Sequence, residues 1–107
     1  MTWKVIYSAK AKQDLRYITE YLSYVIMMPE TAKKLAVHIM NEIEGLDSMP
    51  KRFQVFPYEP WSSQGIRRLP VKNYNVFYEI EEDRHIVSIV RIMYAGRDAT
   101  AQFDESF

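Results

Sequence analysis

The sequence contains no cysteine and only two histidines, His38 and His85. Without cysteine the chain can form no disulfide, no thiolate nucleophile and no cysteine metal site. Two histidines so far apart in the sequence give little support for a metal site of another kind. We therefore expect no metal and no other cofactor, and a protein compatible with a reducing compartment.

The sequence also lacks net charge, because 14 lysines and arginines are balanced by 14 aspartates and glutamates. Any attraction to nucleic acid must then come from a local patch rather than from the field of the whole molecule. No apolar run approaches the ~18 residues of a membrane span, and the first residues lack the apolar stretch of a signal peptide. We expect a cytoplasmic protein without a membrane partner.

What the chain does contain is ample apolar material, with 48% hydrophobic and 14% aromatic residues among 107. This content and length suit one compact domain over residues 1–107, which buries about two thirds of its unfolded surface. Residues 3–7 alternate apolar and polar side chains, as in a short strand, and Ser8 stands where a helix N-cap would. Pro29 suits the first turn of a second helix.

Both predicted helices have an apolar stripe at spacings of three and four residues. The first stripe comprises Ala11, Leu15, Ile18, Leu22 and Val25, and the second comprises Ala32, Leu35, Ala36, Ile39, Ile43 and Leu46. The connection between the helices is very short, so we expect a long antiparallel helical hairpin with facing stripes.

Residues 49–65 contain three prolines and read as a loop, although the loop is rich in aromatic side chains, which we expect to pack on the sheet or the helix ends. Three strands follow, with a turn at Glu82 and Asp83. Pro70 cannot donate a ladder hydrogen bond, which places residues 66–72 at one edge. The N-terminal strand is expected at the other side, beside residues 86–94. The predicted fold is α+β: an N-terminal strand, the helical hairpin and a three-stranded antiparallel meander that completes one antiparallel sheet.

We expect the meander to gather Arg67, Arg68, Arg91, Tyr94 and Arg97 at one end of the molecule. Such a basic and aromatic cluster on a neutral protein favours an anionic or carboxylate-bearing partner. Arg67 and Arg68 are adjacent on a strand and point to opposite faces, so at most one of them shares a surface with Tyr94.

Two further side chains have a structural and a functional interpretation. Arg91 lies among apolar residues, where an unpaired charge is costly, so a salt bridge with Glu79 or Glu81 competes with a role in binding. Trp61 is the strongest candidate for an exposed aromatic anchor, although packing within its loop is the commoner explanation.

Three segments carry a resemblance to a known family: Tyr-Ser-Ala-Lys-Ala-Lys-Gln-Asp-Leu-Arg-Tyr-Ile-Thr-Glu-Tyr at residues 7–21, Arg-Arg-Leu-Pro-Val with Val-Phe-Tyr-Glu between residues 67 and 79, and Arg-Ile-Met-Tyr-Ala-Gly-Arg-Asp at residues 91–98. In this order the chain resembles the RelE/ParE superfamily of bacterial type II toxin–antitoxin systems, and its ParE-like branch more closely. The resemblance implies a RelE/ParE-like fold and a growth-inhibiting toxin linked to plasmid stabilization. It also implies a cognate antitoxin that neutralises the toxin within a hetero-oligomer.

The resemblance implies two activities. ParE-like members are associated with inhibition of DNA gyrase, whereas RelE-like members cut messenger RNA on the ribosome. At the position where nucleases have a middle-strand arginine this chain has Asn75, and where some have a late histidine it has Met93. We therefore favour gyrase binding. A ribosome-dependent endoribonuclease is the alternative, and a degenerate toxin that only binds its antitoxin is a second alternative.

Each of these activities assigns roles to particular residues. If the protein is a nuclease, the catalytic residues are Tyr94 and Arg97, which match positions that nucleases use. The expected target-binding residues are Arg67, Arg68, Lys72, Asn75, Arg91 and Trp61.

Overall fold

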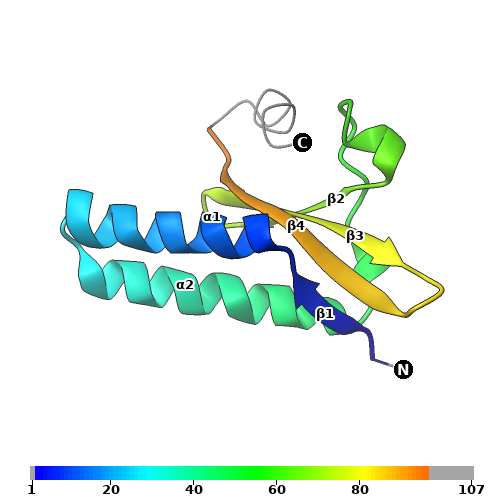
Figure 1. The fold of residues 1–107 in the computed structure, drawn as a ribbon, viewed down its shortest axis with the longest axis horizontal. Helices are drawn as coiled ribbons and strands as arrows, with labels where there is room; N and C mark the ends of the chain where they lie inside the picture. Colours follow the sequence, from blue (N-terminus) through cyan, green and yellow to red (C-terminus); the bar gives the residue numbers. More distant parts are fainter. Residues whose placement is uncertain (1, 97–107) are drawn as a thin grey trace.

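The structure is a computed structural model that describes residues 2–96 (Figure 1). Its principal elements are β1 (Lys4–Tyr7), α1 (Ala9–Glu20), the π-helical turn η1 (Tyr21–Val25), α2 (Pro29–Glu44), β2 (Arg67–Val71), β3 (Tyr74–Glu81) and β4 (Ile86–Tyr94). Three short 3-10 turns, η2 (Gly45–Asp47), η3 (Pro50–Arg52) and η4 (Ser62–Gln64), lie between α2 and β2. None of the helices between residues 2 and 96 combines the length and apolar character that a membrane crossing requires.

The strands form one sheet in the order β1-β4-β3-β2, which confirms the predicted meander and the predicted place of the N-terminal strand. The two meander pairs are antiparallel. However, β1 pairs with β4 in parallel, so the sheet is mixed and not antiparallel throughout. The intervening helices and strands return the chain in its original direction, as a parallel neighbour requires.

Both helices begin where the sequence predicts. The Ser8 hydroxyl oxygen accepts a hydrogen bond of 3.0 Å from the Ala11 backbone N–H, as an N-cap does. The same hydroxyl donates to the Val90 carbonyl oxygen of β4 at 2.9 Å, so it ties the start of α1 to the sheet. Pro29 is the first residue of α2. In Figure 1 the two helices lie side by side as an antiparallel hairpin next to the sheet.

The main core lies between the helical hairpin and one face of the sheet. It contains predicted stripe residues of both helices, together with apolar residues of all four strands. The fully or nearly fully buried members are Ala11, Ile39, Ile43, Leu46, Leu69, Val71, Val76, Tyr78, Val87, Ile89 and Ile92. This confirms the facing stripes over most of the hairpin.

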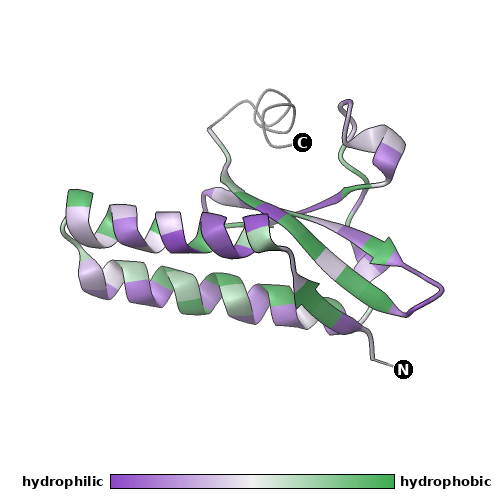
Figure 2. Ribbon diagram, viewed as in Figure 1, coloured by the Kyte–Doolittle hydropathy of each residue, from purple (hydrophilic) through white to green (hydrophobic). Residues whose placement is uncertain are grey.

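The stripe prediction is wrong at the tip of the hairpin, where the Val25 side chain is 64% exposed. The Ile26 backbone N–H donates to the Tyr21 carbonyl oxygen, five residues earlier, at 3.0 Å. This wider π turn shifts the helical phase, so the residues that continue the spacing of three and four after Tyr21 no longer face the core. The end of the first helix consequently carries exposed apolar residues, and Figure 2 colours it hydrophobic.

A second, smaller core lies on the opposite face of the sheet. Residues 53–65, called the aromatic loop below, pack Phe56 and Trp61 against Phe77 of β3 and Met93 of β4. The Trp61 and Phe77 rings stack at 4.2 Å between centroids, and the Phe56 ring meets Phe77 edge-on at 5.2 Å. The prediction that this loop covers the sheet is confirmed. In Figure 1 the loop, drawn in green, stands clear of both helices.

Candidate functional site

Among residues 2–96 the arginines of the predicted basic cluster do not come together with Tyr94, because the two arginines of β2 hold the aromatic loop instead. The Arg67 guanidinium donates to the Phe53 carbonyl oxygen at 2.6 Å and to the Lys51 carbonyl oxygen at 3.3 Å. The Arg68 guanidinium lies over the Phe56 ring, 5.4 Å from its centroid. Phe53 belongs to the helix-side core and Phe56 to the opposite one, so the two arginines do point to opposite faces, as predicted.

Arg91 forms an ion pair, but with a different partner from the one predicted. Its Nε and Nη2 donate to the two carboxylate oxygens of Asp14 on α1, at 2.7 and 2.9 Å. The Ile92 backbone N–H donates to the same carboxylate at 2.9 Å. The prediction that Arg91 forms a salt bridge with Glu79 or Glu81 is therefore wrong.

A one-residue irregularity in β4 explains this change of partner. The register shifts between Phe77 and Tyr78 on β3, so that Val90 is the extra residue of β4. Such a bulge turns side chains away from strict alternation. Val90 packs on the aromatic cluster, while Arg91 reaches α1. Both carboxylate oxygens and the guanidinium are thus committed within the fold.

Tyr94 and Lys72 remain exposed at one end of the sheet. Tyr94 pairs with Tyr74 in register, and Lys72 lies in the turn between β2 and β3. Four residues along β2, at about 3.3 Å each, place the Arg67 backbone some 13 Å from this end. Arg97 falls outside the described residues, so its predicted role stays a prediction.

Asn75 and Met93, the two positions at which the sequence departs from the nucleases that it resembles, face each other on neighbouring strands. Asn75 pairs with Met93 in the β3–β4 ladder. Met93 is 5% exposed and packs in the aromatic cluster with Trp61 and Phe77. The Met93 side chain is therefore part of the hydrophobic core.

Trp61 is fully buried, so the interpretation as an exposed anchor is wrong and packing within the loop is confirmed. Its ring lies between Phe77 and the rest of the loop. Sequence reasoning could not decide this, because a tryptophan in a loop carries no periodicity that indicates which side is covered.

Exposed tyrosines lie elsewhere, on what we call the tyrosine surface: Tyr17, Tyr21 and Tyr94, together with the half-buried Tyr74. Tyr94 is 51% exposed and meets the Tyr74 ring edge-on at 5.7 Å. Burial raises the pKa of Tyr74, and the Tyr94 and Tyr21 phenols raise it further. Tyr17 and Tyr21, four residues apart at the end of α1, were the missed sequence signal for this second stripe.

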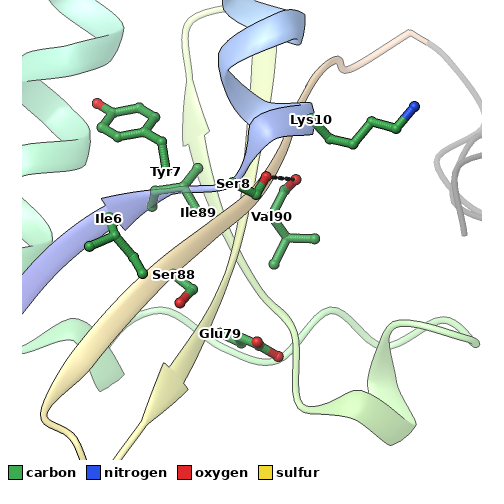
Figure 3. A pocket seen from close by; sticks show the side chains of 8 residues that line it. All are labelled: Ile6, Tyr7, Ser8, Lys10, Glu79, Ser88, Ile89 and Val90. Carbon is green, nitrogen blue, oxygen red and sulfur yellow. Dashed lines mark hydrogen bonds between the residues drawn. The ribbon is translucent and has the colours of Figure 1, made fainter.

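A groove of about 350 Å³ lies over β1, β4 and β3 (Figure 3). Ile6, Ser88 and Glu79 form one cross-strand row in it, since Ser88 pairs with both of the others. The pKa of Glu79 is raised, first by burial and then by the neighbouring Glu81 carboxylate. No sequence expectation included this groove.

The raised pKa of Glu79 gives a stability prediction. A carboxyl whose pKa is higher in the folded protein than in the unfolded chain stabilises the fold at low pH and loses that contribution as pH rises through the folded pKa. Glu79→Gln, which cannot ionise, should therefore be more stable than the wild type at pH 7 by a few tenths of a kcal/mol. Urea unfolding at neutral and acidic pH measures this difference, which should vanish in acid. An unchanged difference between the two pH values would contradict the burial argument.

Comparisons with known proteins agree with this architecture. Residues 5–99 match the model of the ParE toxin family of type II toxin–antitoxin systems. No curated protein matches the chain in sequence. Among solved structures, the chain is similar to the chromosomal ParDE system from P. aeruginosa, with a TM-score of 0.71 and 22% identity over 87% of this chain and 96% of that one.

Two further structures show the same fold at lower identity. A RelBE toxin–antitoxin complex from Mycobacterium tuberculosis has a TM-score of 0.62 and 17% identity, over 88% of this chain and 92% of that one. An archaeal RelE–RelB complex from Pyrococcus horikoshii has a TM-score of 0.59 and 18% identity, over 92% of this chain and all of that one. The RelE/ParE-like fold predicted from sequence is confirmed.

Proposed function

This chain belongs to the ParE toxin family of type II toxin–antitoxin systems, and from that premise we propose that it inhibits growth by binding DNA gyrase. The proposal is that the tyrosine surface contacts the target directly. No chemical step on a substrate is involved in this mode of action.

The observation that supports this proposal most strongly is the aromatic cover over Met93, the β4 partner of Asn75. Cleavage of RNA needs an accessible proton acceptor, a cation for the developing phosphate charge and an acid for the leaving oxygen. Neither Asn75 nor Met93 supplies a charge, and Met93 is packed under Trp61. Arg91, the nearest cation on the same strand, already binds Asp14 through two hydrogen bonds.

The tyrosine surface has the composition of a protein-binding site. Tyrosine side chains combine a large apolar ring with a hydroxyl that can donate or accept, and they are enriched among residues that dominate binding energy. The surface continues toward the exposed apolar tip of the hairpin, where Val25 and Met27 are uncovered. Contiguous exposed apolar surface of this kind marks interaction sites on soluble proteins.

We further propose that a cognate antitoxin neutralises the protein in a hetero-oligomer. Two observations support this proposal: the chain belongs to a family of toxins from toxin–antitoxin systems, and a second groove of about 400 Å³ lies between α1 and α2. Its floor includes Leu15, Ala36 and Met40, and its basic members are Lys12 and Arg16. An amphipathic acidic segment fits such a groove, because its apolar face covers the floor while its carboxylates meet the two cations.

The ribosome-dependent endoribonuclease is the second candidate function. Tyr94 and Lys72 favour it, since both are exposed at the same end of the sheet. A toxin that has lost its activity and only binds an antitoxin would use the groove between the helices alone.

Expression in cells separates the three functions. For a gyrase binder, plasmid DNA should become relaxed, while primer extension on messenger RNA shows no new ends. Discrete cuts within translated codons would instead identify the nuclease, and arrested growth with neither change would contradict both. Normal growth on expression without an antitoxin would indicate the degenerate toxin.

Tyrosine substitutions test the surface itself. Tyr21→Ala and Tyr94→Ala should each weaken target binding about tenfold, because truncating an aromatic contact residue typically costs over 1 kcal/mol. Growth inhibition at graded expression levels reports the loss. Tyr58→Ala is the matched control, since Tyr58 is at least as exposed as Tyr21 and Tyr94 but belongs to the aromatic loop.

Tyr94→Phe distinguishes binding from proton transfer at the same position. It keeps the ring and should retain most of the toxicity of a binder. Full loss in Tyr94→Phe, with Tyr21→Ala unaffected, would support the nuclease and contradict the proposed surface.

A further inference from the structure

The groove in Figure 3 is shaped by a small residue between two larger ones. Ser88 stands in the middle of the cross-strand row, with Ile6 of β1 on one side and Glu79 of β3 on the other. The short serine side chain leaves a depression over β4. The Ser8 hydroxyl donates its hydrogen bond to the Val90 carbonyl oxygen and is not available to a ligand as a donor. The walls of the depression are therefore mostly apolar.

One carboxylate of this face lacks a counterion within residues 2–96. Glu81, two positions further along β3, is 3.3 Å from the Arg84 guanidinium. Glu79 forms no ion pair or hydrogen bond with any side chain in that part of the protein, although it is partly buried. Lys10 lines the groove but extends away from Glu79 in Figure 3. A partly buried charge is costly unless a cation meets it.

We propose that this groove binds a short segment of a protein partner in which an apolar side chain is followed by arginine or lysine. The apolar side chain fills the depression over Ser88, between Ile6 and Val90, and the cation pairs with the Glu79 carboxylate. The charge complementarity of this groove is opposite to that of the groove between α1 and α2, where Lys12 and Arg16 favour acidic segments.

The site is independent of the proposed action on gyrase. It involves β1, β3 and β4 on the face opposite the helix-side core, whereas the tyrosine surface involves α1 and the far end of the sheet. Failure of the test below therefore leaves the gyrase proposal unchanged, and the reverse also holds.

Two capped dipeptides test the site with the full chain. Acetyl-leucyl-arginine amide and its neutral, nearly isosteric counterpart acetyl-leucyl-citrulline amide are titrated into isotope-labelled protein, and the backbone amide shifts of Ile6, Ser88 and Val90 are followed by NMR. The arginine peptide should bind about five- to tenfold more tightly, because a charged partner strengthens a hydrogen bond to a partly buried carboxylate. Ser88→Leu should weaken both peptides by filling the depression.

Glu79→Gln should remove the preference for arginine over citrulline while leaving the citrulline peptide unchanged. Glu81→Gln is the matched control and should keep the preference, since Glu81 has its own partner in Arg84. Equal binding of the two peptides by the wild type, shifts that map elsewhere, or tighter binding of acetyl-leucyl-glutamate amide would overturn the proposal. If raising the protein concentration without peptide causes the same shifts, the groove binds a second copy of the chain, and this result would also overturn the proposal.

Discussion

Asp14→Asn is expected to lower the free energy of unfolding by about 3–5 kcal/mol, because it removes the carboxylate charge that pairs with the buried Arg91 guanidinium. The Asp14 and Arg91 side chains are only 12% and 9% exposed. The carboxylate also accepts from the Ile92 backbone N–H, so one substitution disturbs three hydrogen bonds between α1 and β4. Urea unfolding monitored by circular dichroism measures the change.

A matched control exists on the second helix. Glu42 lies 3.9 Å from His38 in an exposed pair, and Glu42→Gln should change stability by less than about 0.5 kcal/mol. The double variant Asp14→Leu with Arg91→Met should recover part of the loss, since it removes both charges. The Ile92 backbone N–H still loses its acceptor, so the recovery should be incomplete. A similar small effect for Asp14→Asn and Glu42→Gln would show that the ion pair does not hold the helix to the sheet.

Trp61→Ala is expected to lower the free energy of unfolding by about 3–5 kcal/mol, the range found when a large buried aromatic side chain is truncated. The indole ring is completely buried, stacks on Phe77 at 4.2 Å and meets Phe56 edge-on at 6.4 Å. Its removal leaves a cavity between the aromatic loop and the sheet, so Phe77 and Met93 lose their cover. Thermal unfolding gives the loss of stability, and hydrogen exchange of β3 and β4 amides reports the uncovering.

The comparison for this variant is Tyr58→Ala, in the same loop but on its exposed side. Tyr58→Ala should cost far less than Trp61→Ala, because a solvent-exposed ring loses little contact on truncation. Equal losses in the two variants would indicate that the loop is held by its backbone and that the indole is not its anchor.

The fold was largely accessible from the sequence because its signals are local. Ser8 and Pro29 mark helix starts through their own backbone chemistry, and the stripes of both helices depend on a regular spacing. Pro70 places β2 at an edge for an equally local reason. The tip of the hairpin was missed because the π turn at Tyr21–Val25 breaks the regular spacing without a sequence marker.

The site was less accessible, since it depends on contacts between distant residues. The partner of Arg91 lies 77 positions away, and a single extra residue in β4 decides which way the arginine points. Asp14 nonetheless carried a signal: it sits three residues after Ala11 and four before Ile18, within the apolar stripe of α1. A carboxylate in that position indicates a buried cationic partner, although the sequence does not say which one.

Inhibition of purified gyrase by the purified protein is the decisive test of the proposed mode of action. In a supercoiling reaction the wild-type protein should inhibit gyrase in a dose-dependent way, Tyr21→Ala should need about tenfold more protein for the same inhibition, and Tyr58→Ala should match the wild type. Messenger RNA in a purified translation system should stay intact at the same concentrations. Uninhibited gyrase together with cleaved messenger RNA would contradict the account.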